Sequence, residues 1–352
     1  MHLCIMNEEQ KRTEISALGE FGLIKRLIAP FDVHHQSTII SNGDDGAVIQ
    51  SKGNQFVVST DLLLEGVHFD LMYMPLKHLG YKAVVVNLSD VYSMNAKPTQ
   101  ILVSIGVSNR FSIEALEELY AGIKHACDKY KVDLIGGDTT SSQKGLIISV
   151  TAIGEVAPER YVLRGTAKEG DLLCVSGDLG AAYLGLQFLE REKQIYLENP
   201  NISPDLENQS YLIGRQLKPE ARRDIIEFFE KNNLLPTSMI DISDGLSSEI
   251  LHLCDQSGLG CNLYEEKIPI SEEARNAAFT FGLEPTMCAL SGGEDYELLF
   301  TIAQQDYEKI KDHMHFSVIG YMTGINEPPV IITKGGNAHE LVAQGWNAFR
   351  KK

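Results

Sequence analysis

Cysteine is sparse in this sequence, and no two cysteines form a Cys-x-x-Cys pair. The six that are present are scattered from Cys4 to Cys288, which argues against a zinc site and against a dense disulfide framework. We therefore expect a protein of a reducing compartment, the cytoplasm. The first residues also lack a basic segment followed by a long apolar one, so we expect no signal peptide.

Positive charge and long apolar runs are scarce as well. The chain has 31 Lys and Arg against 48 Asp and Glu, a formal net charge of −17, which disfavours nucleic acid and anionic membrane surfaces as partners. A phosphorylated small molecule stays possible if divalent cations separate the negative charges. The most apolar stretch, Leu146 to Ile153, is far shorter than the roughly 18 residues of a membrane helix. We therefore expect no membrane association.

The common nucleotide and hydrolase motifs are missing too. The sequence has no Walker pattern Gly-x-x-x-x-Gly-Lys-Ser/Thr, no protein-kinase motif set and no Gly-x-Gly-x-x-Gly dinucleotide loop. It also lacks a serine nucleophile elbow and a His-Glu-x-x-His zinc helix. Hydrolase and dehydrogenase activities thus have no sequence support, and any nucleotide site must be of another type.

What is present is the composition of a folded protein with about two domains. Of the 352 residues, 43% are hydrophobic and 22% are charged, close to globular averages. The hydrophobic periodicity predicts helices over 14–29, 75–94 and 112–130 and strands over 55–60, 101–107, 132–135 and 146–156. We predict an α/β (α+β) fold of mixed sheets flanked by helices, with domains 1–158 and 159–352.

The second of these domains shows a similar alternation after a break at 158–160. The pattern predicts a strand over 172–176, a helix over 179–190 and a surface loop over 192–208. Beyond that loop, it predicts helices near 220–232, 245–256 and 271–281 and strands near 239–242, 296–301 and 318–321.

Acidic residues gather beside Gly, Ser and Thr where predicted strands end. The segments are Gly43-Asp44-Asp45-Gly46, Ser59-Thr60-Asp61, Gly136-Gly137-Asp138-Thr139, Asp241-Ile242-Ser243-Asp244-Gly245 and Ser291-Gly292-Gly293-Glu294-Asp295, and Asp90 ends an apolar helical run. Each alone suits an ordinary turn or helix cap. Brought together, two carboxylates about 4 Å apart would repel by roughly 4 kcal/mol at an effective dielectric of about 20. Mg²⁺ relieves such repulsion and also binds phosphates, so the pattern predicts metal-assisted phosphate chemistry.

In their order along the chain, these motifs resemble those of the thiamine-monophosphate kinase family. The resemblance begins at Gly19-Glu20-Phe21-Gly22, includes Asn87-Leu88-Ser89-Asp90 and continues toward the C-terminus. It implies the two-domain fold of aminoimidazole ribonucleotide synthetase and its relatives, with a homodimer formed through the N-terminal domain. It also implies ATP-dependent phosphorylation of thiamine phosphate to thiamine diphosphate, the last step in the biosynthesis of that cofactor.

The resemblance further implies roles for individual residues. Several Mg²⁺ ions would be held by Asp44, Ser59, Thr60, Asp61, Asp90, Asp138, Asp241 and Asp244. The acids Asp44, Asp90, Asp138 and Asp244 would be catalytic, and ATP would contact Tyr120, Gly137, Asp138, Arg164 and Ser243. Thiamine phosphate would meet His68, Glu294 and Trp346, the single tryptophan, whose aromatic face suits a cationic thiazolium. Without the resemblance, Tyr120 on its amphipathic helix is more often a core residue, and Arg164 is as well interpreted as an ordinary surface residue. The corresponding alternatives are a structural histidine for His68, a turn acid for Glu294 and a C-terminal core anchor for Trp346.

Other functions of the same superfamily are weighed against this one. Selenophosphate synthetase carries a reactive Cys or selenocysteine in a glycine-rich setting, whereas Cys4 lies in Leu3-Cys4-Ile5. Hydrogenase-maturation relatives end in a reactive cysteine, whereas this chain ends in Lys352. A non-catalytic sensor would be expected to have lost some acidic motifs, and a substrate screen would separate an enzyme that activates an amide or acyl oxygen. No His or Cys has a partner base at a recognisable spacing, so direct in-line transfer is predicted.

Overall fold

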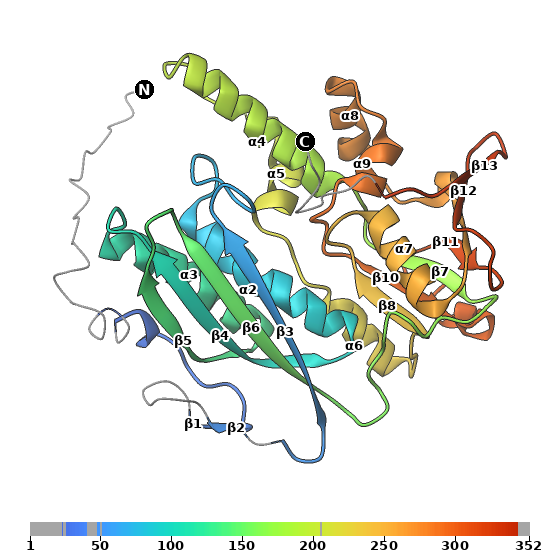
Figure 1. Ribbon diagram of the computed structural model, residues 1–352, viewed down its shortest axis with the longest axis horizontal. Coiled ribbons are helices and arrows are strands. Elements are labelled where there is room, and N and C mark those ends of the chain that lie inside the picture. Colours follow the sequence, from blue (N-terminus) through green and yellow to red (C-terminus); the bar gives the residue numbers. More distant parts are fainter. Residues whose placement is uncertain (1–22, 24–25, 41–47, 50, 205, 344–352) are drawn as a thin grey trace.

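The computed structural model of the chain describes residues 23, 26–40, 48–49, 51–204 and 206–343. The described backbone contains a four-stranded sheet, a seven-stranded sheet and a short pair formed by β1 (Thr38–Ile40) and β2 (Val48–Ile49). Figure 1 shows the two larger sheets side by side, each with its own helices. Of the predicted helix over 14–29, only Leu23 and residues 26–29 are described, and Leu23 and residues 26–28 are helical.

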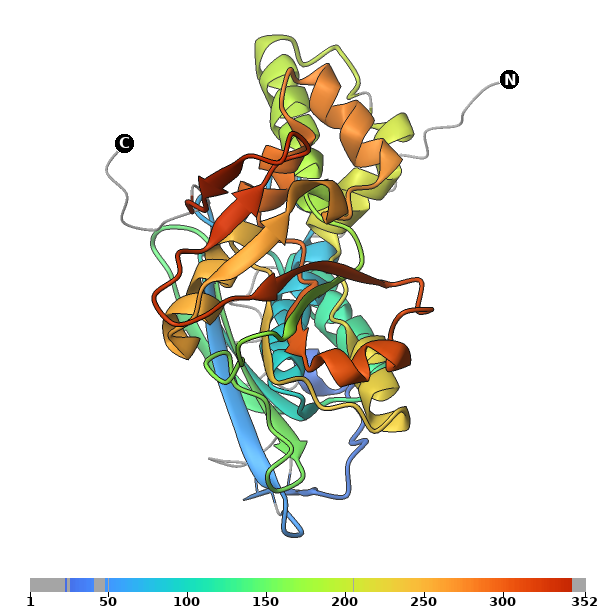
Figure 2. The same ribbon diagram turned by 90° about the vertical axis from the view of Figure 1, so that its right-hand side faces the viewer.

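The four-stranded sheet has one face covered by helices, whereas no helix of the described residues covers the other face. Its strand order is β3-β6-β4-β5, with the β4–β5 pair parallel and the others antiparallel. The elements are β3 (Gln55–Leu64), α2 (Leu76–Ser93), β4 (Lys97–Val107), α3 (Ile113–Tyr130), β5 (Asp133–Ser141) and β6 (Ile147–Val156). Helix α2 lies against β3 and β6, and α3 packs against α2 (Figures 1 and 2).

The two helices of this layer approach closely because glycines stand at their contact. A Cβ atom on Gly80 of α2 would lie 2.0 Å from the Leu119 carbonyl oxygen, and one on Gly122 of α3 would lie 1.9 Å from the Lys77 carbonyl oxygen. Any larger side chain would force the helices apart. The close crossing holds α2 firmly against the sheet, and α2 carries several of the site residues described below.

Strand β3 shows the period-two alternation expected of a sheet with two different faces. Val57 and Leu63 are buried toward α2, whereas Phe56, Val58 and Leu62 are 44%, 62% and 52% exposed on the opposite face. No helix of the described residues covers that opposite face in either view (Figures 1 and 2). The sheet therefore presents an apolar outer surface.

The seven-stranded sheet has the order β13-β12-β9-β11-β7-β10-β8. Its neighbours pair antiparallel except β12 and β9, which run parallel. The strands are β7 (Leu172–Ser176), β8 (Ser238–Asp241), β9 (Cys261–Tyr264), β10 (Leu298–Ile302), β11 (Phe316–Met322), β12 (Val330–Ile332) and β13 (Ala338–Glu340). Its helices are α4 (Ala181–Glu198), α5 (Ser210–Leu217), α6 (Arg223–Lys231), α7 (Leu246–Ser257), α8 (Glu272–Thr280) and α9 (Pro285–Ser291).

The predicted surface loop over 192–208 is wrong in its first part, because α4 continues to Glu198. Glu192 is buried there, and Arg191 bonds its carboxylate at 2.7 Å while lying 4.8 Å from the centre of the Phe188 ring. Polar side chains that make such contacts allow the helix to continue through a segment whose sequence lacks an apolar periodicity. Strand β7 lies where it was predicted, whereas α5, α9, β9, β12 and β13 had not been predicted.

The two parts of the chain share a hydrophobic core. One buried cluster extends from Leu79 and Leu88 of α2 to Phe229 of α6 and Phe300 of β10. The segment 157–171 connects the last strand of the first sheet to the first strand of the second, and the limits 1–158 and 159–352 stay a prediction. No helix in the described part of the chain has the length and apolar character needed to cross a bilayer.

Candidate active site

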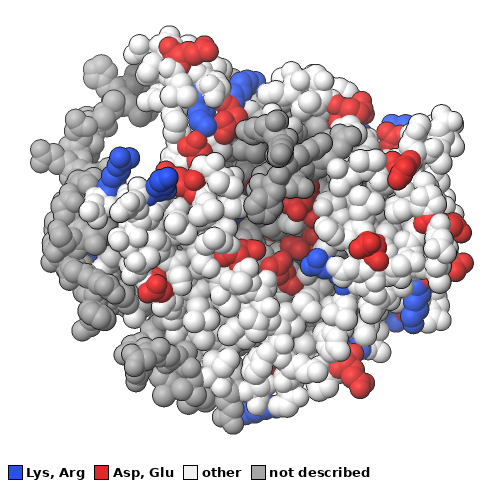
Figure 3. Space-filling view, in the orientation of Figure 1, with Lys and Arg blue, Asp and Glu red and all other residues white. Residues whose placement is uncertain are grey.

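A cavity of about 490 Å³ is lined by residues from both parts of the chain. Its wall is formed by β3 and the loop after it, by α2 and α4, and by the turns that follow β8 and α9. Figure 3 shows Asp and Glu side chains gathered around a hollow on the face seen in Figure 1. The lining includes Asp61, Asp90, Asp241, Asp244 and Glu294, all predicted as site residues.

Three of these acids, Asp61, Asp90 and Asp241, come from three different elements and form what we call the acidic cluster. Asp61 lies within β3 rather than at its end, Asp90 lies in the last turn of α2, and Asp241 is the last residue of β8. The motif Asn87-Leu88-Ser89-Asp90 connects them. The Asp61 amide donates to Asn87 Oδ1 at 2.9 Å, and Ser89 Oγ donates to Asp241 Oδ2 at 2.7 Å.

The acidic cluster is short of positive charge. Burial, reinforced by the charge of Asp90, raises the pKa of Asp61 to about 6 and that of Asp241 to about 7. Burial also raises the pKa of Asp90, although a hydrogen bond from Ser59 Oγ and the charge of Arg164 oppose the shift. Within the described residues, no Lys or Arg forms an ion pair with any of the three. A bound cation would therefore relieve repulsion here.

The donor set of the acidic cluster fits Mg²⁺. The described residues include no group of three or more His, Cys, Asp or Glu that could hold a metal ion by themselves. Mg²⁺, however, is commonly bound by one or two carboxylates and completes its octahedron with waters and phosphate oxygens. Buried carboxylates with raised pKa values and no ion-pair partner match that open kind of site.

The turn Asp241 to Gly245 joins β8 to α7 and carries two more predicted residues. Gly245 has φ 111°, a conformation that favours glycine. Ser243 and Asp244 line the cavity, and the Asp244 amide donates to Glu249 Oε1 at 3.0 Å. Glu249 is buried in the first turn of α7, and burial raises its pKa to about 8. Its place in the sequence, an acid in the first helical turn, is typical of this type of contact.

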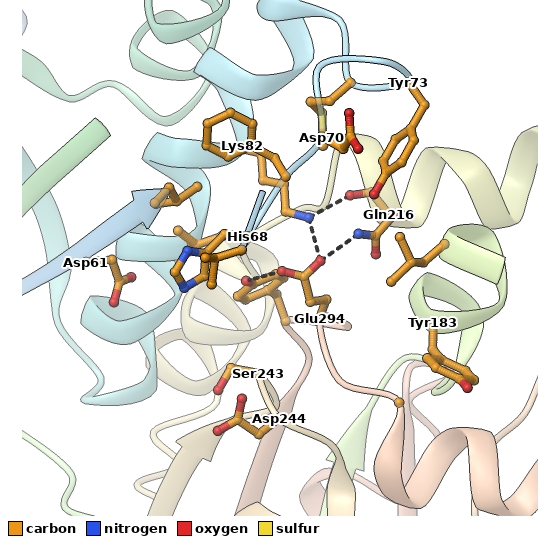
Figure 4. A pocket seen from close by; sticks show the side chains of 18 of the residues that line it. Asp61, His68, Asp70, Tyr73, Lys82, Tyr183, Gln216, Ser243, Asp244 and Glu294 are labelled. Carbon is orange, nitrogen blue, oxygen red and sulfur yellow. Dashed lines mark hydrogen bonds and ion pairs between the residues drawn. The ribbon is translucent and has the colours of Figure 1, made fainter. Parts of the chain in front are cut away.

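Four further residues lie opposite the turn, as Figure 4 shows. Glu294 meets Lys82 of α2 and Gln216 of α5, and His68 lies beside them. The Leu64 amide donates to His68 Nδ1 at 3.0 Å, so the neutral ring carries its hydrogen on Nε2. Burial lowers the pKa of His68 and favours that neutral form.

Other predicted residues are not brought to this cavity by the described chain. Thr60 lies on the opposite face of β3 from Ser59 and Asp61, where its Oγ1 donates to the Val150 carbonyl at 3.1 Å. Gly137 and Asp138 are exposed on β5. The roles predicted for Thr60, Gly137 and Asp138 stay predictions.

Two predicted ATP contacts also lie away from the cavity lining. Tyr120 is buried in α3 at the edge of the Phe31 ring, and burial raises its pKa to about 12. Arg164 lines a second cavity of about 270 Å³, together with Met94 and Met239. Asp44 and Trp346 lie outside the described residues.

Comparison with known proteins agrees with this architecture. Residues 43–156 match the family described as AIR synthase related protein, N-terminal domain, and residues 168–331 match its C-terminal domain. The thiamine-monophosphate kinase of Bacillus subtilis is 32% identical over 95% of this chain and 100% of its own length. The chain belongs to the thiamine-monophosphate kinase family. A second member, from Aquifex aeolicus, is 36% identical over 85% of this chain and 90% of its own length.

A solved structure is similar to this chain throughout. It is described as "AaThiL complexed with AMPPCP and TMP" and is 33% identical, with a TM-score of 0.72 over 95% of this chain and 98% of its own. The α/β two-domain fold and the family predicted from the motifs are therefore confirmed.

Among the residues in or beside the site that were not found from the sequence, three have the contacts described above. Lys82 had a usable signal, since it is a charged residue inside the apolar run that forms α2. Glu249 had a weaker one, its place in a first helical turn. Gln216 had none, because its contact with Glu294 joins residues 78 positions apart.

Proposed function

We propose that this protein uses ATP to phosphorylate thiamine monophosphate, forming thiamine diphosphate. The observation that carries the proposal is the acidic cluster, which brings Asp61, Asp90 and Asp241 from three elements to one cavity. Two anionic phosphates can approach each other only where their charge is offset. The relatives named thiamine-monophosphate kinase and the similar structure described in complex with AMPPCP and TMP support these two substrates.

We propose that Mg²⁺ occupies the acidic cluster together with Asp244, and that Asp44 and Asp138 contribute as the family resemblance implies. Mg²⁺, when bound, offsets phosphate charge and holds donor and acceptor in line. The chain's own residues prepare the site: Ser59 and Ser89 hold the carboxylates of Asp90 and Asp241 by hydrogen bonds. The amide-rich turn before α7 presents Ser243 to the cavity, where its hydroxyl suits a phosphate oxygen.

We propose a direct transfer between the two phosphates rather than a phosphoenzyme. His68, the histidine that lines the cavity, uses Nδ1 to accept the Leu64 amide. Its other nitrogen carries a hydrogen and acts as a donor. His68 is therefore suited to donate a hydrogen bond to a phosphate oxygen of the substrate.

The test is incubation with ATP, Mg²⁺ and thiamine monophosphate. Thiamine diphosphate and ADP should appear in equal amounts, and EDTA should abolish turnover because the acids lose their cation. Product from free thiamine but not from its monophosphate, or full turnover in EDTA, would contradict the assignment. Binding of both ligands without turnover would instead identify a sensor.

We also propose a cytoplasmic homodimer joined through the outer face of the four-stranded sheet. Phe56, Val58 and Leu62 supply an apolar surface there, and such a surface favours association. The five described cysteines are free thiols, which suits a reducing compartment. Light scattering after gel filtration should give the mass of two chains. Val58→Asp should give the mass of one, and a wild-type protein that elutes as a monomer would refute the dimer.

A further inference from the structure

Lys82 is a buried positive charge beside the proposed substrate site. Its side chain is 2% exposed on α2, a helix whose other buried residues near it are mostly apolar. An ammonium group in such surroundings is destabilising unless it is paired and hydrogen-bonded. The position of Lys82 is therefore explained by its partners.

Lys82 and Gln216 both bind the same oxygen of Glu294 and leave its other oxygen available. Lys82 Nζ lies 2.6 Å from Glu294 Oε2 and donates to the Gln216 carbonyl at 2.9 Å. Gln216 Nε2 donates to the same Oε2 at 2.7 Å (Figure 4). Glu294 Oε1 has one described contact, the Tyr296 hydroxyl at 3.5 Å, which is at the outer limit of a hydrogen bond. Oε1 can thus accept a stronger bond from a ligand.

The backbone of Glu294 is held in an uncommon conformation. Glu294 and Tyr296 have φ values of 60° and 52°, in the left-handed region. Residues other than glycine remain there only when surrounding contacts enforce it. The Glu294 amide donates to the Ser243 carbonyl at 2.7 Å, which ties this turn to the one before α7. The backbone from which the Glu294 side chain projects is therefore held in one conformation.

The side chain of Gln216 donates to Glu294, and this orientation leaves its own side-chain oxygen without a partner in the described part of the chain. A carboxylate only accepts hydrogen bonds, so the contact with Glu294 turns the NH₂ group of Gln216 toward it. Gln216 Oε1 is then buried with no hydrogen-bond partner among the described residues. An orphaned buried acceptor is unfavourable. The three side chains are thus arranged to hold the Glu294 carboxylate in place, although this leaves Gln216 Oε1 without a hydrogen bond from any described residue.

The charge of the pair decides what Glu294 can recognise. Lys82 and Glu294 together are neutral, so the pair attracts a fixed cation such as a thiazolium only weakly. What it offers is a directed acceptor at Oε1. In thiamine monophosphate the thiazolium has no N–H, whereas the aminopyrimidine carries an exocyclic amino group that donates hydrogen bonds.

We propose that Lys82 is a positioning residue that directs Glu294 Oε1 toward the exocyclic amino group of the substrate's aminopyrimidine. The inference rests on the proposed function, because it takes thiamine monophosphate as the substrate. Lys82 acts through Glu294, since its described contacts are made to Glu294 and to the Gln216 carbonyl.

The test compares thiamine monophosphate with oxythiamine monophosphate, in which an oxo group replaces the amino group. Wild type should use the oxo compound about tenfold less efficiently, as expected for a lost hydrogen bond to a charged acceptor. Lys82→Met should raise KM for thiamine monophosphate about tenfold and remove most of that discrimination, while KM for ATP changes less than about twofold. The double variant with Glu294→Gln should be no worse than Glu294→Gln alone, because both changes remove one interaction.

Lys97→Met is the matched control, because Lys97 also forms a 2.6 Å ion pair, with Glu230, at an exposed site outside the cavity lining. It should leave both KM values unchanged. Equal rises of KM for ATP and thiamine monophosphate in Lys82→Met would make Lys82 a structural residue and overturn the inference.

Two further outcomes can be measured with the wild-type protein alone, so they do not depend on whether a variant folds. Wild type that phosphorylates both compounds equally well would overturn the inference while the proposed function stands. Wild type that does not phosphorylate thiamine monophosphate would overturn both.

Discussion

Two groups of buried acids in this protein are treated in opposite ways. In the first, Glu297 lies between two arginines: Arg215 is 3.3 Å from its Oε1, and Arg222 forms an ion pair with its Oε2. In the second, the acidic cluster of Asp61, Asp90 and Asp241, no described Lys or Arg forms an ion pair with any member. The first group carries its own counterions, whereas the second has none among the described residues.

The neighbour of Glu297 shows how a buried acid can serve the fold. Asp295 lies 3.7 Å from Arg215 and accepts the Gly180 and Ala182 amides, at 2.7 and 3.3 Å, where α4 begins. Burial still raises the pKa of Asp295 to about 7, but its partners are all protein groups. The counterions of Glu297 and Asp295 thus stabilise the fold, whereas the lack of such counterions among the described neighbours of the acidic cluster supports the proposal that these acids bind a metal ion.

The largest expected effect is on catalysis at the acidic cluster. Asp90→Asn keeps the shape of the side chain and removes its charge, so turnover should fall roughly 100- to 1000-fold. The metal-free variant should melt no lower than metal-free wild type, because one repelling charge is gone. Steady-state kinetics and thermal melting measure the two effects. Asp128→Asn, which loses a 2.7 Å surface pair with Lys124, is the control, and near-normal turnover of Asp90→Asn at saturating Mg²⁺ would contradict the ligand role.

Removing one of the two arginines that pair with Glu297 should lower stability rather than turnover. Arg222→Met leaves Glu297 with a single arginine, and breaking a buried pair of this kind should lower the free energy of unfolding by about 3 kcal/mol. Urea denaturation measures that loss. The kcat of the protein that stays folded should be unchanged at low temperature. If stability is preserved and kcat falls instead, the division between fold-serving and ligand-serving acids is mistaken.

The smallest effect is a pH dependence that Asp241 should confer. Its pKa rises from 3.8 to about 7 on folding, so the folded state keeps a proton that the unfolded state releases as pH rises from about 4 to 7. Metal-free protein should therefore lose stability across that range. At pH 8 the free energy of unfolding of Asp241→Asn should exceed that of wild type, and the difference should vanish near pH 4. Added Mg²⁺ should stabilise wild type at pH 8 more than the variant, and equal pH profiles for the two proteins would refute the charge argument.

Local pattern alone was sufficient for one strand of the first sheet and for its two helices, whereas β3, β4 and β5 are longer than the predicted strands over 55–60, 101–107 and 132–135. The predicted strand over 146–156 and helices over 75–94 and 112–130 correspond to β6, α2 and α3 within two residues at each end, because each carries its own apolar periodicity. The same reasoning failed at 192–198, where polar side chains continue α4 through contacts that no periodicity reveals. It also could not find α5, whose eight residues include Gln216.

The sequence by itself determined which residue types the site would contain and to which family the chain belongs. The acids stand beside Gly, Ser and Thr in motifs that can be identified without coordinates, and the alternation of β3 already separates Thr60 from Ser59 and Asp61. Only the tertiary structure decided which acids meet. Asp241 joins Ser89 across 152 positions and Glu294 joins Lys82 across 212. Such pairs depend on how sheets and helices pack over long separations, and the spacing of residues along the chain carries no record of that packing.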